Sequence, residues 1–472
     1  MGGQSRALDV RRAGVLLHVT SLPAPSTRST SGDLGDEAYR FVDFLADAGC
    51  SIWQVLPLVP TNEESRSPYD ALSAMAGNPE LISRAHQSAY HLEDPSALDE
   101  QQESAFTSWC AEQGGWLDPY VEFTALRGLH GLARWPTWAP ALRDRDPRSV
   151  DGALRPLADR VRDLRFEQWV FAVQWARLRR YAASKGVLLF GDLPIFVSLD
   201  SADVWASREL FRLDEEGRPI TVTGCPPDYF SADGQRWNNP HYDWDAMAAD
   251  GFAWWRRRIA RQRELFDLVR IDHFRGFEAT WHVPADAATA GEGWWVPGAG
   301  AEILSALVDT AGPGTLVAED LGVITQEVEA LRSRFGLPGM KVLQFAFDGN
   351  PDNPHLPHHH GEHSVVYTGT HDNDTTVGWW EHLDEQTHDR IRSRLLDPYE
   401  AMPWAFIHVA LESTARLAVV PAQDLLGLGS ESRMNTPGTA QGNWAWQAPA
   451  GAFDENLAAT VRALVAEADR LT

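Results

Sequence analysis

The sequence is poor in cysteine and contains no long apolar run. Its 472 residues include three cysteines, which are odd in number and far apart, at Cys50, Cys110 and Cys225. This argues against a disulfide framework, and no Cys/His cluster has the spacing of a zinc site. No uninterrupted apolar stretch approaches the length of about 18 residues that suggests a membrane span. Residues 1–12 also lack the apolar core of a signal peptide, so we expect a cytoplasmic protein without a membrane partner.

Basic residues are scarce relative to acidic ones. Lys and Arg total 41 while Asp and Glu total 66, which gives a net charge of −25. Such a surplus repels phosphate backbones and argues against a nucleic-acid partner. The apolar content of 44% and the charged content of 23% are those of an ordinary globular protein. The 20 tryptophans outnumber the 9 tyrosines, and their flat faces suit sugars, although packing in a large core explains them equally well.

Short apolar segments alternate with longer amphipathic ones along the chain, which is the pattern of repeated β/α units. Eight of the apolar segments have the length and composition of strands. They are residues 14–18, 52–56, 187–192, 268–272, 315–319, 341–345, 364–368 and 418–422. Eight strands with helical segments between them predict an α/β fold of the TIM (β/α)8 barrel type. A doubly wound sheet is the alternative, but no glycine-rich phosphate loop follows the first segment.

Two stretches interrupt this alternation. Residues from about 60 to 165 are polar, with Pro and Gly turns and short helical patches, and we interpret them as an inserted, mostly helical subdomain after the second strand. Residues from about 199 to 250 are irregular and rich in Asp, Gly, Pro and aromatic side chains, and we interpret them as a second insertion, after the third strand. Residues 1–472 are therefore predicted to form a single barrel with two insertions.

Carboxylates stand at or just after the ends of four predicted strands, at Asp192, Asp272, Glu319 and Asp372. The active site of a TIM barrel lies at the C-terminal ends of its strands, so these side chains are expected to converge. One carboxylate at a strand end is a weak signal, but several on separate strands are much less expected by chance. Paired carboxylates, one protonated and one ionised, are the chemistry of glycosidic bond cleavage.

Two of these carboxylates have neighbours that would set their protonation. Arg270 lies two residues before Asp272, so both side chains point to the same side of the strand and the guanidinium can keep Asp272 ionised. A purely structural ion pair explains this spacing equally well. Glu319 follows the apolar residues 316–318, and apolar surroundings raise the pKa of a carboxyl group, which suits an acid/base role.

Longer segments around these positions resemble the signature regions of one enzyme family. LVRIDHFRGF (268–277), VAEDLG (317–322) and YTGTHDNDT (367–375) are similar to those of the 4-α-glucanotransferases, also called amylomaltases or disproportionating enzymes, which form glycoside hydrolase family seventy-seven of the α-amylase clan. Further similar segments include SPYDALSAMAGNPELIS (67–83) and QDLLGLGSESRMNTPGTAQGNWAW (423–446). The resemblance covers nearly the whole chain. In agreement with this family, no β-sandwich domain is expected after the barrel.

The resemblance implies a retaining double displacement. Asp272 would be the nucleophile that forms a β-glucosyl-enzyme intermediate, and Glu319 would be the general acid of the first step and the base of the second. Asp372 would hold substrate hydroxyls and stabilise the distorted sugar. Arg270 would orient Asp272, and His371 would form a hydrogen bond with the same sugar.

Five further positions are implied to support the site or to bind substrate. By resemblance, Asp192 supports the site and Tyr69 stacks against the sugar beside the cleavage point. Tyr229, Phe230 and Trp237 lie in the 199–250 region, on a loop that folds over the cleft in proteins of this type. A loop that shields the intermediate from water favours transfer to an acceptor sugar over hydrolysis.

We therefore expect a 4-α-glucanotransferase that moves α-1,4-glucan segments between maltooligosaccharides, with no cofactor and no metal. An α-glucan hydrolase on the same barrel is the alternative. A non-catalytic glucan-binding protein is a third possibility, which the intact carboxylates disfavour. The histidine-rich segment 355–363 is interpreted as a solvated loop rather than a metal site. The sequence leaves the oligomeric state open.

Overall fold

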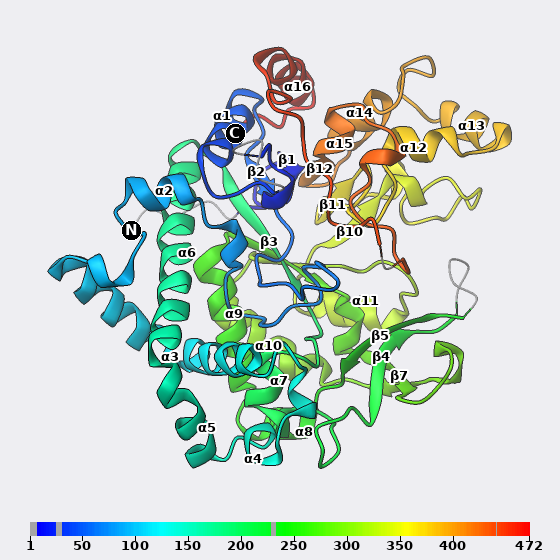
Figure 1. The fold of residues 1–472 in the computed structure, drawn as a ribbon. Helices are drawn as coiled ribbons and strands as arrows, with labels where there is room; N and C mark the ends of the chain where they lie inside the picture. Colours follow the sequence, from blue (N-terminus) through cyan, green and yellow to red (C-terminus); the bar gives the residue numbers. More distant parts are fainter. Residues whose placement is uncertain (1–6, 25–30, 228–232, 440) are drawn as a thin grey trace.

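The computed structural model describes residues 7–24, 31–227, 233–439 and 441–472 (Figure 1). Its main sheet has eight parallel strands in the order β10-β11-β12-β1-β2-β3-β6-β9. They are β1 (Arg12–Leu16), β2 (Ile52–Gln54), β3 (Leu188–Pro194), β6 (Leu268–Asp272), β9 (Leu316–Ala318), β10 (Gly339–Val342), β11 (Ser364–Tyr367) and β12 (Leu417–Pro421). The Ala318 N–H of β9 donates a hydrogen bond of 2.9 Å to the carbonyl of Pro338, directly before β10. The sheet is therefore closed, and the predicted TIM barrel is confirmed.

Each of the eight strands contributes apolar side chains to one buried cluster inside the barrel. Its members include Leu16, Ile52, Phe190, Leu268, Val317, Met340, Val365 and Leu417. Side chains that alternate with these along each strand face the surrounding helices. Both faces of a strand are thus apolar, which is why the strands appear in the sequence as continuous apolar runs. The observed strands agree with the predicted ones to within a few residues, and β6 occupies the predicted range 268–272.

Helices surround the barrel (Figure 1). They are α1 (Asp36–Asp47), α2 (Arg84–Ala89), α3 (Glu100–Leu129), α4 (Pro140–Arg143), α5 (Pro147–Leu154), α6 (Ala158–Ser184), α7 (Ala202–Ala206), α8 (Trp244–Ala249), α9 (Ala253–Leu265), α10 (Gly300–Ala311), α11 (Gln326–Arg334), α12 (Thr376–Glu381), α13 (Glu385–Arg392), α14 (Trp404–Glu412), α15 (Ala422–Leu425) and α16 (Glu455–Glu467). The last of them, α16, packs beside α1, so the two ends of the barrel sequence meet. Of the helices in the described ranges, none has the length and apolar character needed to cross a membrane.

The connection between β2 and β3 contains a much longer helix than the sequence predicts. Short helical patches were expected, but α3 extends over 30 residues and packs along α6. Gly114, Gly115 and Pro119 lie inside α3 and obscure its pattern in the sequence. Its start is fixed locally by a capping box, in which Asp99 accepts a 2.8 Å hydrogen bond from the Gln102 N–H and the Gln102 side chain accepts one of 3.0 Å from the Asp99 N–H. Packing on α6 therefore overrides three poor helix formers.

A second, antiparallel sheet stands beside the barrel, and the sequence did not predict it. Its strand order is β5-β4-β7-β8, and it appears at the lower right of Figure 1. The strands are β4 (Thr221–Cys225), β5 (Gln235–Pro240), β7 (Ala279–Pro284) and β8 (Trp294–Pro297). β4 and β5 belong to the connection between β3 and β6, whereas β7 and β8 belong to the next one. The region 199–250 is thus less irregular than expected, because β4 and β5 pair with each other and β4 also pairs with β7 from a separate part of the chain.

The histidine-rich segment 355–363 is partly packed, which corrects its interpretation as a solvated loop. His360 is buried, and its Nδ1 lies 2.8 Å from Ser413 Oγ. His355 Nδ1 accepts a hydrogen bond of 3.1 Å from the Val342 N–H of β10. These partners come from other elements, so local polarity could not reveal them. Within the part of the chain that the structure describes, no cluster of three or more His, Cys, Asp or Glu side chains could hold a metal ion.

Candidate active site

The carboxylates singled out in the sequence lie at one end of the barrel. Asp192 is in the C-terminal half of β3, Asp272 ends β6, and Glu319 directly follows β9. These three strands are adjacent in the sheet, and the C-terminal ends of parallel strands meet at one rim. Asp372 lies on the loop between β11 and α12, at the same end of the barrel. The rim therefore carries four carboxylates on four different strand ends.

Arg270 links two of these carboxylates. Its Nη1 lies 2.8 and 2.7 Å from the two oxygens of Asp192, and its Nη2 lies 2.7 Å from Asp272 Oδ1. The side chains of Arg270 and Asp192 are 4% and 0% exposed, whereas that of Asp272 is 26% exposed. Burial lowers the pKa of Arg270, but the two carboxylates outweigh it and raise this pKa well above its ordinary value. A permanent cation therefore forms an ion pair with Asp272 and leaves this side chain accessible.

Glu319 has a contrasting environment. Burial raises its pKa, the positive charge of Arg270 opposes this, and the negative charge of Asp272 adds to it, so that the pKa is about 8. The two oxygens of Glu319 accept hydrogen bonds from the N–H groups of His273, at 2.6 Å, and Leu321, at 2.8 Å. At neutral pH this carboxyl group is therefore largely protonated and able to donate its proton.

Tyr69 contacts the buried carboxylate from the loop after β2. Its hydroxyl donates a hydrogen bond of 2.9 Å to Asp192 Oδ2. Burial, and then the charge of Asp192, raise the pKa of this phenol well above its ordinary value, so it remains a donor. The Tyr69 ring stacks on the imidazole of His371, with centroids 5.3 Å apart and planes inclined by 11°, and the ring of Trp444 lies 5.7 Å away. These three rings provide the flat faces that suit the apolar side of a sugar.

Asp372 is open to solvent, with a side chain that is 45% exposed. Asn435 Nδ2 donates a hydrogen bond of 2.6 Å to Asp372 Oδ1, and His371 Nε2 lies 3.4 Å from Oδ2. Arg433 Nη2 donates another of 2.6 Å to the main-chain carbonyl of Asp372. The sequence did not single out Asn435 or Arg433, although both belong to the family-like segment 423–446. Only the folded chain brings this segment against Asp372.

Trp237, on β5, reaches the rim from the second sheet. Its ring lies 4.8 Å from that of His273, at an angle of 80°. Because His273 directly follows Asp272, Trp237 stands beside the carboxylate end of β6. Tyr229 and Phe230, predicted to lie on the same cleft-covering loop, fall outside the described residues, so their placement stays a prediction.

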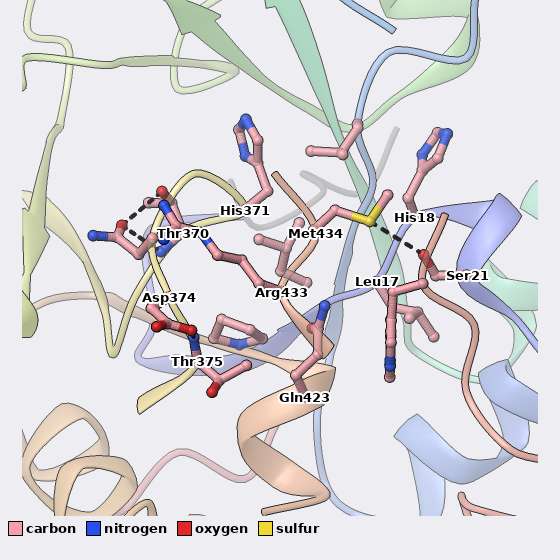
Figure 2. Close-up of a pocket in the computed structure, with 15 residues that line it drawn as sticks. Leu17, His18, Ser21, Thr370, His371, Asp374, Thr375, Gln423, Arg433 and Met434 are labelled. Atoms are coloured by element: carbon pink, nitrogen blue, oxygen red, sulfur yellow. Dashed lines mark hydrogen bonds between the residues drawn. The ribbon is translucent and has the colours of Figure 1, made fainter. Parts of the chain in front are cut away.

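A pocket beside His371 adds one residue that the sequence did not indicate. Figure 2 shows the side chains of His18, His371 and Arg433 around this pocket, where Ser21 also contacts the sulfur of Met434. Burial, and then the nearby His371, lower the pKa of His18 to about 3. The His18 imidazole is therefore neutral at physiological pH, and a neutral imidazole can donate or accept one hydrogen bond, as sugar hydroxyls require.

The site pairs two carboxyl groups in contrasting environments. Asp272 forms an ion pair with Arg270, whereas burial keeps Glu319 largely neutral. Environments that separate the pKa values of neighbouring carboxyl groups assign one as an acid and the other as an anion. A proton-donating carboxyl group and a carboxylate are the two groups that glycosidic bond cleavage requires.

Comparison with known proteins identifies the family. The profile of glycoside hydrolase family seventy-seven, described as 4-alpha-glucanotransferase, matches residues 17–95 and 85–452. The 4-alpha-glucanotransferase of Thermus thermophilus is 46% identical, over 98% of this chain and 99% of the relative. That of Synechocystis sp. is 44% identical, over 93% of this chain and 94% of the relative.

A solved structure agrees with these relatives. The amylomaltase from Streptococcus agalactiae in complex with acarbose superposes with a TM-score of 0.92 at 32% identity, over 98% of this chain and 100% of that one. Sequence and structure thus agree over almost the full length of the chain. The chain belongs to the 4-α-glucanotransferases, glycoside hydrolase family seventy-seven.

Proposed function

We propose that this chain transfers α-1,4-glucan segments between maltooligosaccharides by a retaining double displacement. The observation that carries the proposal is the pairing of Asp272, held by Arg270 at 2.7 Å, with Glu319, whose pKa is about 8. The ionised group can attack while the protonated group donates, which is what the first step of a retaining mechanism needs.

In the first step, Asp272 attacks the anomeric carbon of the donor sugar. The bond from this carbon to the glycosidic oxygen breaks, and the Glu319 proton passes to that oxygen, so that the leaving glucan departs with a free 4-hydroxyl. The product is a glucosyl ester of Asp272 and an ionised Glu319. Asp372 and His371 hold the hydroxyls of the distorted sugar, and Tyr69 stacks beside it.

In the second step, Glu319 acts as a base. It takes the proton of an acceptor 4-hydroxyl as that oxygen attacks the anomeric carbon, and the ester bond breaks to restore the carboxylate of Asp272. Transfer requires that the 4-hydroxyl of the acceptor sugar reacts with the glucosyl ester faster than water does. Trp237, on β5, contacts His273 next to the nucleophile, and exclusion of water from the intermediate there favours transfer.

The substrates we propose are maltooligosaccharides and other α-1,4-glucans. The wall formed by Tyr69, His371 and Trp444 supports a neutral sugar ligand, and the net charge of −25 does not oppose one. We also propose that the β2–β3 and β3–β6 connections are insertions within a single catalytic barrel. The low cysteine content supports a reducing, cytoplasmic setting.

Incubation with maltotriose tests the proposal. A transferase gives a ladder of longer and shorter products while the number of reducing ends stays constant. A hydrolase raises that number, and a non-catalytic binding protein leaves maltotriose unchanged. The proposal fails if either of the last two results is obtained with folded protein.

A further inference from the structure

Asp424 is a buried carboxylate outside the residues assigned to the site. It lies in α15, directly after β12, and is 1% exposed. Its Oδ2 accepts hydrogen bonds from the hydroxyls of Thr368, at 2.6 Å, and Thr376, at 2.7 Å. Its Oδ1 accepts a third, of 2.7 Å, from the Thr376 N–H. All three donors are uncharged and buried, so one carboxylate joins two separate points of the chain.

These two points bound the loop that carries Asp372. Thr368 directly follows β11, and Thr376 is the first residue of α12. Within the loop, Asn373 Oδ1 accepts hydrogen bonds of 2.9 and 2.8 Å from the N–H and the hydroxyl of Thr370, which closes a turn (Figure 2). The loop thus has a fixed internal shape, and Asp424 holds both of its ends.

Further contacts tie the same loop to the segment after Asp424. Ser430 Oγ donates a hydrogen bond of 2.7 Å to Asp374 Oδ2, and Arg433 Nη2 donates one of 2.6 Å to the Asp372 carbonyl. The chain that follows β12 therefore contacts the loop at its ends and in its middle. The position of the loop relative to the barrel therefore depends on contacts with the segment after β12 as well as on its direct connection to β11.

We propose that Asp424 is a positioning residue for the transfer reaction, because it fixes both ends of the loop 368–376 and thereby sets the positions of His371 and Asp372 relative to Asp272. The inference rests on the function proposed above, in which His371 and Asp372 act on the sugar. Asp424 itself touches no substrate. Its importance follows from geometry, since a displacement of about 1 Å at a catalytic group can cost about 100-fold in rate.

A carboxylate suits this position because it only accepts hydrogen bonds. In Asp424→Asn, the amide oxygen can still accept from the Thr376 N–H. The amide NH2 group then faces the hydroxyls of Thr368 and Thr376, which must turn from donors into acceptors. Hydrogen bonds to a neutral amide are also weaker than those to a carboxylate. The loop keeps its internal turn but is held less firmly at its ends.

A double-mutant cycle tests this inference. Asp424→Asn and His371→Ala are made singly and together, and kcat/KM for maltotriose is measured where circular dichroism shows all four proteins folded. We expect Asp424→Asn to lower kcat/KM about tenfold in the wild-type background and by about threefold or less in the His371→Ala background. Equal losses in both backgrounds would mean that Asp424 does not act through His371, and would overturn the proposal for that residue.

Two further variants separate positioning from general stability. Asp267→Asn alters a carboxylate that accepts a 2.9 Å hydrogen bond from the Leu189 N–H at the opposite end of the barrel, and kcat/KM should stay within about twofold of wild type. Thr376→Val removes one hydroxyl, keeps the N–H bond to Asp424, and should lower kcat/KM about threefold even if Asp424→Asn does not fold. An unchanged kcat/KM in Thr376→Val would overturn the inference.

The wild-type measurement keeps this inference apart from the proposed function. Wild-type protein that does not convert maltotriose rejects the proposed function. Active wild-type protein together with a fully active, folded Asp424→Asn variant rejects only the positioning role.

Discussion

The main-chain N–H of His273 donates a hydrogen bond of 2.6 Å to Glu319 Oε2. His273 directly follows Asp272, and the Glu319 N–H bonds in turn to the carbonyl of Ile271 at 3.0 Å. The ends of β6 and β9 therefore hold each other through a main-chain hydrogen bond and through the carboxyl group of Glu319 itself. Because the backbone of paired strands moves less than a free side chain, the nucleophile and the acid of the proposed mechanism are kept in a fixed relation.

The raised pKa of Glu319 predicts a loss of activity at alkaline pH. The first step needs the protonated form, which is depleted as the pH rises through about 8. We expect kcat/KM for maltotriose to fall about tenfold per pH unit above that value. Circular dichroism at each pH and recovery of activity on return to neutral pH control for unfolding. A kcat/KM that stays constant to about pH 9.5 would contradict the assignment of Glu319 as the acid.

The same group predicts how stability depends on pH. Glu319 releases its proton near pH 4.5 in the unfolded chain but only near pH 8 in the folded one. Between these values the folded state binds more protons, so the contribution of Glu319 to stability declines as pH rises, on the order of 1 kcal/mol per pH unit. Glu319→Gln removes this titration. The free energy of unfolding is measured with denaturant at several pH values. Relative to wild type, that of the variant should increase up to about pH 8, and the difference between the two should stay constant above it. A constant difference throughout would contradict the raised pKa.

Asp272→Asn should abolish transfer and leave binding largely intact. The amide cannot form the glucosyl ester, so we expect kcat to fall about 1000-fold or more. The substitution changes one atom at a side chain that is 26% exposed, and the wall of aromatic rings that faces the sugar is unchanged. Calorimetric titration with a maltooligosaccharide measures binding, and product chromatography measures transfer. Ordinary activity in this variant would remove the nucleophile assignment.

The barrel was predictable from the sequence because each of its strands carries its own signal. In residues 364–367, for example, the buried segment SVVY is visible as a strand without knowledge of its neighbours. The second sheet gave no such signal. β4 pairs with β7 from a different connection, and Gly224 within β4 weakens its strand character. Its stability comes from partners that only the folded chain supplies.

The site divides in the same way. Asp192, Asp272 and Glu319 were predictable because one rule, the convergence of strand ends, brings them together. The contact of Arg270 with Asp272 followed from their spacing on one strand, whereas its second contact, with Asp192, joins two strands. Asn435 approaches Asp372 from a loop that no periodicity places. Contacts between loops depend on tertiary packing, and local patterns do not contain them.

Tyr69→Phe tests the hydrogen bond that crosses the site. The variant keeps the ring that stacks on His371 and loses the donor to Asp192, so we expect kcat/KM to fall about tenfold. Tyr69→Ala also removes the stacking face and should lower kcat/KM clearly more than Tyr69→Phe does. Tyr181→Phe is a matched control, since its hydroxyl donates a 2.6 Å bond to Asp43 outside the barrel. If Tyr69→Phe and Tyr181→Phe change kcat/KM equally, the hydrogen bond from Tyr69 to Asp192 has no specific role in the site.

Arg470→Met should destabilise the fold without changing the chemistry. The Arg470 side chain is fully buried and donates to main-chain carbonyls at the N-terminal end of the barrel, those of Arg12, Leu411, Ser413, Ala415 and Arg416. Met removes all five of these hydrogen bonds. The carbonyls of Leu411 and Arg416 each keep a second donor, Arg11 Nη2 and the Arg12 N–H, but the loss of five hydrogen bonds should still lower the free energy of unfolding by about 3 kcal/mol.

Arg462→Met is the control for Arg470→Met. Among the described residues, the hydrogen bonds of Arg462 are exposed ones of 3.3 and 3.4 Å to the carbonyls of Asp47 and Ala46, so this variant should cost less than about 0.5 kcal/mol. Urea unfolding measures both variants against wild type, and kcat for maltotriose is compared where all three proteins are folded. Equal stability of the two variants would contradict the predicted contribution of Arg470 to stability, and a kcat lowered only by Arg470→Met would contradict a purely structural role.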